Sequence, residues 1–170
     1  MNGILERWNR ADAQAAREAM IACCGAGRWA VTMVQSRPFA SVAELRAAAD
    51  RIWSTMHEAD WLEAFACHPR IGERKAAAQA SPQSSTWSRQ EQAGVRDTQA
   101  RILDELAEDN ARYEERFGFT YIVCATGKSA AEMLDILRGR LSRDRDEELR
   151  EAAEQQRQIL QIRLGKWLSS

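Results

Sequence analysis

The sequence predicts an all-α protein: a single compact helical domain of about seven or eight helices with one short extended segment. Apolar side chains recur at helical spacing through most of the 170 residues. Short stretches rich in Gly, Pro and Ser separate these helical segments. Only residues 117–125 combine aromatic and β-branched side chains as strands do, and no second stretch could pair with them. Side chains, helix ends, water or a ligand must therefore satisfy the backbone of this segment.

Length and charge limit the organisation of the chain and its partners. A chain of 170 residues can bury one substantial core, so we expect residues 1–170 to form one domain. Its 24 basic and 25 acidic residues nearly cancel, leaving a net charge of -1 without a long block of one sign. This balance argues against a nucleic-acid-binding surface and against a membrane-binding patch. Small molecules or proteins remain as expected partners.

The cysteines and the apolar runs predict the cellular compartment of the protein. The four cysteines include an adjacent pair and show no C-x-x-C or C-x-x-H spacing, so we expect neither a disulfide framework nor a structural zinc site. The first residues lack the apolar core of a signal peptide, and no apolar run approaches the ~20 residues of a membrane span. The expected location is therefore the reducing cytoplasm.

The first half of the chain predicts a series of helices. After a short apolar turn at residues 4–8, an alanine-rich helix over 11–24 should close at Gly25 and Gly27. A short helix over 29–35 follows. Ser41 and Glu44 have the capping-box form and should begin a helix with one apolar face. That face is expected to carry Val42, Leu45, Ala49, Ile52, Trp53 and Met56.

The second half begins with a brief segment, 73–80, that has helical composition, and a loop over 81–86. A capping box from Ser88 to Glu91 should begin a long helix that runs to about Arg116. A third capping box, at residues 129–132, predicts a further helix. Ser142 is expected to begin the last helix, whose charged first half should lie on the outside before its apolar end packs into the body.

The most informative short motif is residues 67–72, where an apolar helical run stops at His68. Pro69 disfavours helical backbone at the preceding residue and lacks an N–H donor, so His68 should lie at a helix end. A histidine there can face a cleft and act near neutral pH. The alternative is structural: a helix-terminal imidazole that bonds to a backbone carbonyl. Taken alone, His68 is a weak indication of function.

Other candidate residues have equally plain structural explanations. Glu91 occupies the capping-box position that favours glutamate, although the same helix start, with Ser88 and Gln92, offers N–H groups to an anionic or amide-rich ligand. Arg163 lies in an apolar stretch and needs either a path to solvent or an anionic partner. His57 and Asp60 could help to hold a metal, but no further ligand pattern lies nearby, and a solvated break between helices explains them better.

Taken together and in order, several motifs span nearly the whole chain. They are Arg37-Pro38-Phe39, His68-Pro69 followed by a glycine, Ser88-x-x-Glu91-Gln92-x-Gly94, Phe117-Gly118-Phe119-x-Tyr121-Ile122-Val123-Cys124-Ala125 and Arg163-Leu164. Each motif is weak alone, but the ordered set is specific. In this set the chain resembles the 2-oxo-4-hydroxy-4-carboxy-5-ureidoimidazoline (OHCU) decarboxylase family.

The resemblance implies an all-α enzyme, usually a homodimer, that removes CO₂ from OHCU to give (S)-allantoin in urate degradation, without a metal or organic cofactor. It places the catalytic residues at His68, Glu91 and Arg163. It places the substrate contacts at Pro69, Ser88, Arg89, Gln90, Gln92 and the backbone of Thr120, Tyr121, Ile122, Val123 and Cys124. Thr120 departs from the proline common in the family, and Arg70 from an acidic residue.

The resemblance also suggests roles for these residues. His68 is expected to donate a hydrogen bond or a proton, Glu91 to orient His68 or the substrate, and Arg163 to bind substrate oxygen atoms. Two alternatives stay open at this point. The chain could be a non-catalytic protein-interaction module on the same scaffold, or it could decarboxylate a related cyclic ureido acid.

Overall fold

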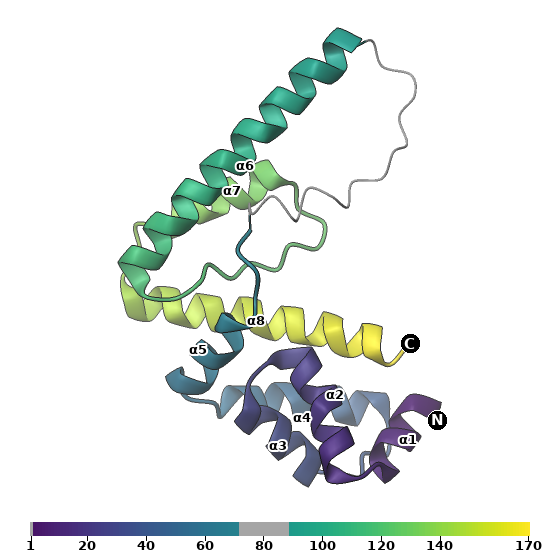
Figure 1. Cartoon of the computed structure of the whole chain (residues 1–170). Coiled ribbons are helices and arrows are strands. Elements are labelled where there is room, and N and C mark those ends of the chain that lie inside the picture. The colour runs from purple at the N-terminus through teal and green to yellow at the C-terminus, as the bar shows by residue number, and fades with distance from the viewer. Residues whose placement is uncertain (1, 72–88) are drawn as a thin grey trace. The chain divides into compact units, whose positions relative to one another are not determined.

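The computed structural model describes residues 2–71 and 89–170, and from 89 to 97 it describes the backbone alone. Over these residues the chain forms eight helices and no strand (Figure 1). The prediction of an all-α fold with seven or eight helices is therefore confirmed. No helix in the described ranges is long and apolar enough to cross a membrane.

The helices follow one another with short connections. Their bounds are α1 (Gly3–Arg10), α2 (Ala13–Cys24), α3 (Gly27–Gln35), α4 (Val42–Ser54), α5 (Glu58–Ala66), α6 (Arg89–Phe117), α7 (Ala130–Arg140) and α8 (Arg145–Trp167).

The helices are divided between two compact units. The first contains Met1–Cys67 and Leu149–Ser170, and the second contains His68–Glu148. Helix α8 contributes its first turn to the second unit and its remaining turns to the first. The expectation that residues 1–170 form one domain stays a prediction, and each unit is described by itself below.

In the first unit, α3 packs against α2, α4 and α5 (Figure 1). Trp29 is fully buried, and its indole N–H donates to the carbonyl of Ala49 on α4 at 3.1 Å. Trp53 donates to the carbonyl of Ala153 at 3.0 Å, which attaches α4 to α8. Other fully buried side chains of this core include Leu5, Met20, Met33, Leu45, Leu160 and Leu164.

In the second unit, α6 and α7 pack side by side (Figure 1). Ser129 and Glu132 form the predicted capping box at the start of α7, each accepting a backbone N–H of the other residue. An aromatic cluster lies where α6 ends and the extended segment begins. It consists of Tyr113, Phe117, Phe119 and Tyr121, with ring centroids 4.7 to 6.1 Å apart in the closest pairs.

Several predicted boundaries need correction. The last helix begins at Arg145, not Ser142, because the Asp144 carboxylate accepts the N–H of Glu147 at 2.8 Å and acts as the cap. Gly27 begins α3 and does not help to close α2. The first segment, expected to be a short turn, is a helix of eight residues, α1.

The prediction that the charged first half of α8 lies outside is also wrong at Glu148, which is fully buried. At the start of α4, Ser41 accepts the N–H of Glu44 as predicted, but the Glu44 carboxylate reaches Ala40 instead of Ser41. The segments expected at 73–80 and 81–86, and the cap residue Ser88, lie outside the described residues.

Candidate functional site

His68 follows the end of α5, as its proline neighbour predicts. The last helical residue is Ala66, and Cys67 caps the helix with its N–H donating to the Ala64 carbonyl at 3.2 Å. His68 and Pro69 are then non-helical, and the side chain of His68 is half-buried. The imidazole therefore lies at a helix end with part of its surface open to solvent.

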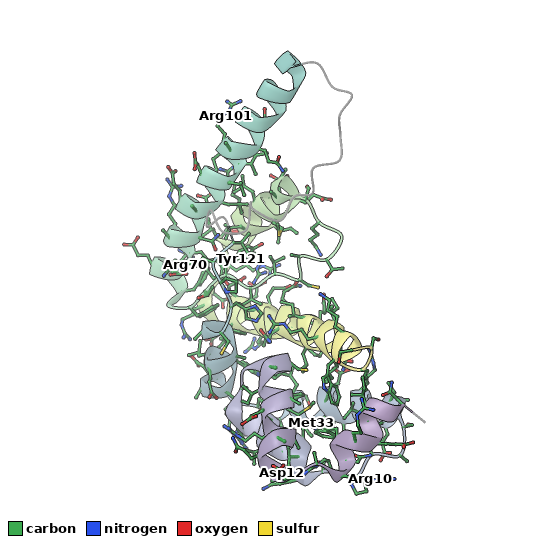
Figure 2. All side chains as sticks on the ribbon, turned by 45° about the vertical axis from the view of Figure 1, so that its right-hand side comes forward. Arg10, Asp12, Met33, Arg70, Arg101 and Tyr121 are labelled. Carbon is green, nitrogen blue, oxygen red and sulfur yellow. The ribbon has the colours of Figure 1, made fainter. Side chains whose placement is uncertain are left out.

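The turn after His68 is attached to α6 by two contacts. The guanidinium of Arg70, which is labelled in Figure 2, pairs with Glu114 through two hydrogen bonds of 2.7 Å. Asn110, which is 2% exposed, donates from its amide to the carbonyls of Ile71 and Leu106, each at 2.8 Å. A cavity of about 550 Å³ lies beside this turn and is lined by Arg70, Ile71, Ala107, Asn110, Ala111, Glu114 and Glu115.

The predicted contacts Arg89, Gln90 and Gln92, with the predicted catalytic Glu91, occupy the first turns of α6, where the backbone alone is described. Ser88 lies outside the described residues. Because α6 is continuous and a helix rises 1.5 Å per residue, Glu91 lies about 28 Å along its axis from Asn110. The structure thus places Glu91 and Asn110, the residue that holds the turn after His68, at different parts of α6. The pairing of Glu91 with His68 stays a prediction.

Residues 120–125, within the segment expected to be extended, form neither helix nor strand, and as predicted they have no strand partner among the described residues. Gly118, with a φ of 80°, ends α6 in the left-handed region and turns the chain into it. Tyr121 to Cys124 are buried, and Thr120 is half-buried. The carbonyl of Ile122 accepts from Arg140 at 2.7 Å, and that of Cys124 accepts from the Lys128 ammonium at 2.8 Å.

Beneath this segment lies a buried polar cluster that sequence reasoning missed: Tyr113, Arg140 and Glu148. Arg140 is 3% exposed and donates from Nε to Glu148 Oε1 at 2.7 Å, with a second, short bond from Nη2. The Tyr113 hydroxyl also makes a short hydrogen bond to Glu148 Oε1. Burial, reinforced by this bond to the carboxylate, raises the pKa of Tyr113 well above its ordinary value. The only sign of this cluster in the sequence is Arg140, which follows an apolar helix face.

Arg163 lies on α8 in the first unit and is half-buried. Its Nη1 donates to the carbonyl of Cys23 at a long 3.5 Å, and no carboxylate in the described part of the chain lies within ion-pair distance. The neighbouring thiols are not activated, because burial raises the pKa of Cys23 to about 11 and that of Cys24 to about 12.

The predicted site residues are thus divided between the two units. His68, Pro69, the start of α6 and residues 120–124 belong to the second unit, whereas Arg163 belongs to the first. Their convergence into one site stays a prediction. His57, considered as a metal ligand, is exposed and caps α5, with its N–H donating to Asp60 at 2.9 Å. The described residues contain no cluster of three or more potential metal ligands.

Comparison with known families gives a match over most of the chain. The model of the OHCU decarboxylase family matches residues 9–165. The "uric acid degradation bifunctional protein TTL" of Arabidopsis thaliana is 35% identical over 147 residues, which are 86% of this chain and 45% of that protein. This chain therefore spans less than half the length of the plant protein. The 2-oxo-4-hydroxy-4-carboxy-5-ureidoimidazoline decarboxylase of Amia calva is 30% identical, over 79% of this chain and 77% of the other.

Solved structures resemble the fold over nearly its full length. A crystal structure of an OHCU decarboxylase in the presence of (S)-allantoin has a TM-score of 0.73 and 32% identity, and the match covers 94% of this chain and all of that one. A crystal structure of an (S)-allantoin synthase has a TM-score of 0.69 over 96% of this chain and 53% of that one. Its identity is 16%, so this second likeness concerns the fold alone.

Proposed function

We propose that this chain, which belongs to the OHCU decarboxylase family, removes CO₂ from OHCU and thereby forms (S)-allantoin in urate degradation. The observation that carries the proposal is the family match over residues 9–165, which includes the positions of His68, Glu91 and Arg163. A relative that bears the decarboxylase name is matched over 77% of its own length, so the likeness covers most of an enzyme of this kind.

The reaction sets a clear electrostatic task. When the C–C bond to the carboxylate breaks, CO₂ departs, and the bonding electron pair stays on the ring carbon and its conjugated neighbours. One proton is taken up overall: the hydroxyl-bearing carbon that loses CO₂ becomes the ring carbonyl of allantoin, and the neighbouring ureido-bearing carbon gains the hydrogen and becomes the stereocentre. A catalyst must therefore bind the carboxylate without stabilising it too strongly, and it must offer donors where the charge moves.

We assign the donor role to His68. Its position after the last turn of α5, half-buried beside Pro69, leaves part of the imidazole open to a small molecule. An imidazole ring carries N–H donors, so it can donate a hydrogen bond or a proton as charge develops.

Arg163 is proposed to bind the oxygen atoms of the substrate. It is half-buried and has no carboxylate partner among the described residues, so an anionic ligand would complete its hydrogen bonding. Pro69 and the backbone of residues 120–124 are proposed as further contacts that orient the ring and its ureido group. A fixed orientation would decide to which face the proton is added, and hence which enantiomer forms.

Glu91 is proposed to orient His68 or the substrate, and Ser88, Arg89, Gln90 and Gln92 to contribute at the same helix start. Exposed backbone N–H groups at a helix N-terminus favour anions and amide oxygens. Because α6 carries Glu91 about 28 Å from Asn110, which holds the turn after His68, a separate variant tests the role of Glu91. Glu91→Gln keeps the shape of the side chain and removes its charge.

The central test compares the two histidines. His68→Asn should lower kcat/KM for freshly generated OHCU by about 10²- to 10⁴-fold, the usual contribution of a general acid or base. His57→Asn is the matched control, since His57 is exposed and asparagine also caps helices well. OHCU loss and the chirality of the allantoin are followed by absorbance and circular dichroism, beside the spontaneous decay of OHCU.

A turnover by His68→Asn within twofold of the parent chain would refute this role. If the parent chain itself forms no allantoin while its circular dichroism shows it folded, a non-catalytic interaction module is the better explanation. Turnover of a related cyclic ureido acid, without turnover of OHCU, would instead identify that compound class as the substrate.

We further propose that the enzyme acts as a homodimer in the cytoplasm, as the family resemblance implies. Sedimentation velocity at several protein concentrations measures the oligomeric state directly. A monomer at the concentrations used in the assay would exclude the dimer as the active form.

A further inference from the structure

The buried cluster of Tyr113, Arg140 and Glu148 lies directly against the proposed substrate-binding backbone. Arg140 uses Nε and Nη2 for the Glu148 carboxylate and Nη1 for the carbonyl of Ile122. Its guanidinium also lies 5.0 Å from the ring centroid of Tyr121, the preceding residue. One side chain thus contacts two successive residues of the extended segment.

The contact with Ile122 fixes the direction of one peptide group. A trans peptide is planar, so the carbonyl of Ile122 and the N–H of Val123 point in opposite directions. Since the carbonyl is directed to Arg140, the Val123 N–H is directed away from the buried cluster. Within the described residues this N–H has no hydrogen-bond partner. The phenol of Tyr121 adds another restraint on the segment, because it donates to the Met133 carbonyl at 3.1 Å.

We propose that Arg140, held by Glu148, is a positioning residue for the decarboxylation: it orients the Ile122–Val123 peptide so that the Val123 N–H, and not the Ile122 carbonyl, faces the substrate. The inference rests on the proposed function and deepens it. Stability alone would not require this arrangement, because apolar side chains can replace a buried ion pair without loss of stability. The planar guanidinium donates from three nitrogens in fixed directions, so it holds the carboxylate and the carbonyl in one defined geometry.

The test separates positioning from folding with two arginines of the same helix. Arg140→Lys keeps the charge but replaces the planar fork by one ammonium group, which cannot reproduce the separate directions of the Nε, Nη1 and Nη2 bonds. Arg138→Lys is the control, since Arg138 also joins α7 to α6, through Asp109 at 2.8 Å and Glu105 at 2.6 Å, and no bond links it to residues 120–124. We expect Arg140→Lys to raise KM for OHCU about tenfold or more, with a smaller fall in kcat, because a misplaced donor weakens binding.

Arg138→Lys should leave both constants within about twofold of the parent chain. Glu148→Gln keeps an oxygen acceptor for Arg140 and Tyr113, so it should retain more activity than Arg140→Lys. A folded Arg140→Lys chain with unchanged KM and kcat would overturn the proposal. If Arg140→Lys does not fold, the triple variant Arg140→Met, Glu148→Leu, Tyr113→Phe removes the whole polar cluster, and unchanged constants there would overturn it equally.

A spectroscopic arm is independent of turnover. In protein labelled with ¹³C and ¹⁵N, loss of the Arg140 bond should move the Ile122 carbonyl resonance, and added (S)-allantoin should move the Val123 N–H resonance in the parent chain but not in Arg140→Lys. If the parent chain does not turn over OHCU, the proposed function fails while the Ile122 resonance still reports on Arg140. An Ile122 resonance that is the same in both proteins would refute the positioning role.

Discussion

Asn110 holds the turn after His68 through hydrogen bonds from its side-chain amide. Its amide nitrogen donates to Ile71 and to Leu106 on α6, so one side chain fixes both the turn and its own helix. The residue is 2% exposed, and its Oδ1 is buried without a hydrogen-bond partner in the described part of the chain. An amide suits this position because two carbonyl oxygens accept from it, whereas a carboxylate would repel both.

Asn110→Ala should therefore loosen the His68 turn. We expect the free energy of unfolding to fall by about 1–3 kcal/mol, since two carbonyls lose their donor. We also expect kcat/KM for OHCU to fall, since His68 lies three residues before Ile71. Denaturant unfolding and the OHCU assay measure the two effects.

Glu114→Ala is the matched control for this variant. It removes the Arg70 pair from the same turn, but Arg70 is 59% exposed, and an exposed ion pair contributes only about 0–1 kcal/mol. If Glu114→Ala costs as much stability and activity as Asn110→Ala, the ion pair and not the buried amide is the anchor of the turn.

The residues that the sequence predicted and those that it missed differ in one physical respect. His68 could be placed at a helix end because Pro69 acts on its immediate neighbour. Asn110, Arg140 and Glu148 act on partners 39, 18 and 8 positions away in the chain, and no periodicity marks such pairs. Glu148 was misplaced because it belongs to a run of charges that normally indicates a solvated helix face.

At the scale of elements, the end of α2 is fitted closely to the end of α5. Gly25 ends α2 with a φ of 87°, and a Cβ added to it would meet Cys67 Sγ at 2.8 Å and Cys67 Cβ at 3.0 Å. Cys67 directly precedes His68. Any side chain at position 25 would therefore both strain the left-handed backbone and displace the residue that precedes His68.

Gly25→Ala should cost about 2–4 kcal/mol of unfolding free energy, the sum of backbone strain and overpacking. Gly127→Ala is the control, because Gly127 has a similar φ of 77° and nothing lies within 4 Å of its added Cβ. That variant should cost about 1–2 kcal/mol, from strain alone. If the two variants lose the same unfolding free energy in urea, Cys67 moves aside for the added methyl group without a measurable penalty.

Helix ends with a local chemical cause were predicted well. Ser41, Ser129 and Gly25 act through hydrogen bonds or backbone angles within four residues, so the sequence alone identifies them. The start of α8 was placed at Ser142 because serine is a good cap, yet Asp144 performs that function two residues later. Both residues are chemically suitable as caps, but the Ser142 hydroxyl donates to the Gly139 carbonyl at 3.1 Å.

At the scale of the whole molecule, the all-α class followed from periodicity, whereas the grouping of helices did not. Apolar spacing shows which face of a helix is buried but not which neighbour covers it. The division into two units follows such packing choices, with α8 continuous through both. The convergence of Arg163 with His68 depends on the same choices, and therefore only the family resemblance suggested it.

The chain should nevertheless unfold as one cooperative domain. Helix α8 is continuous through both units, so unfolding of its turns in one unit should also unfold its turns in the other.

The positions of the aromatic residues allow a test of this prediction. Trp8, Trp29, Trp53, Trp61 and Trp167 all belong to the first unit, and Tyr113 and Tyr121, the two tyrosines of the chain, belong to the second. In a Trp87→Phe background, tryptophan fluorescence reports on the first unit, and ¹⁹F resonances of incorporated fluorotyrosine report on the second. Coincident urea transitions are expected; transitions that differ in midpoint would show two domains that unfold separately.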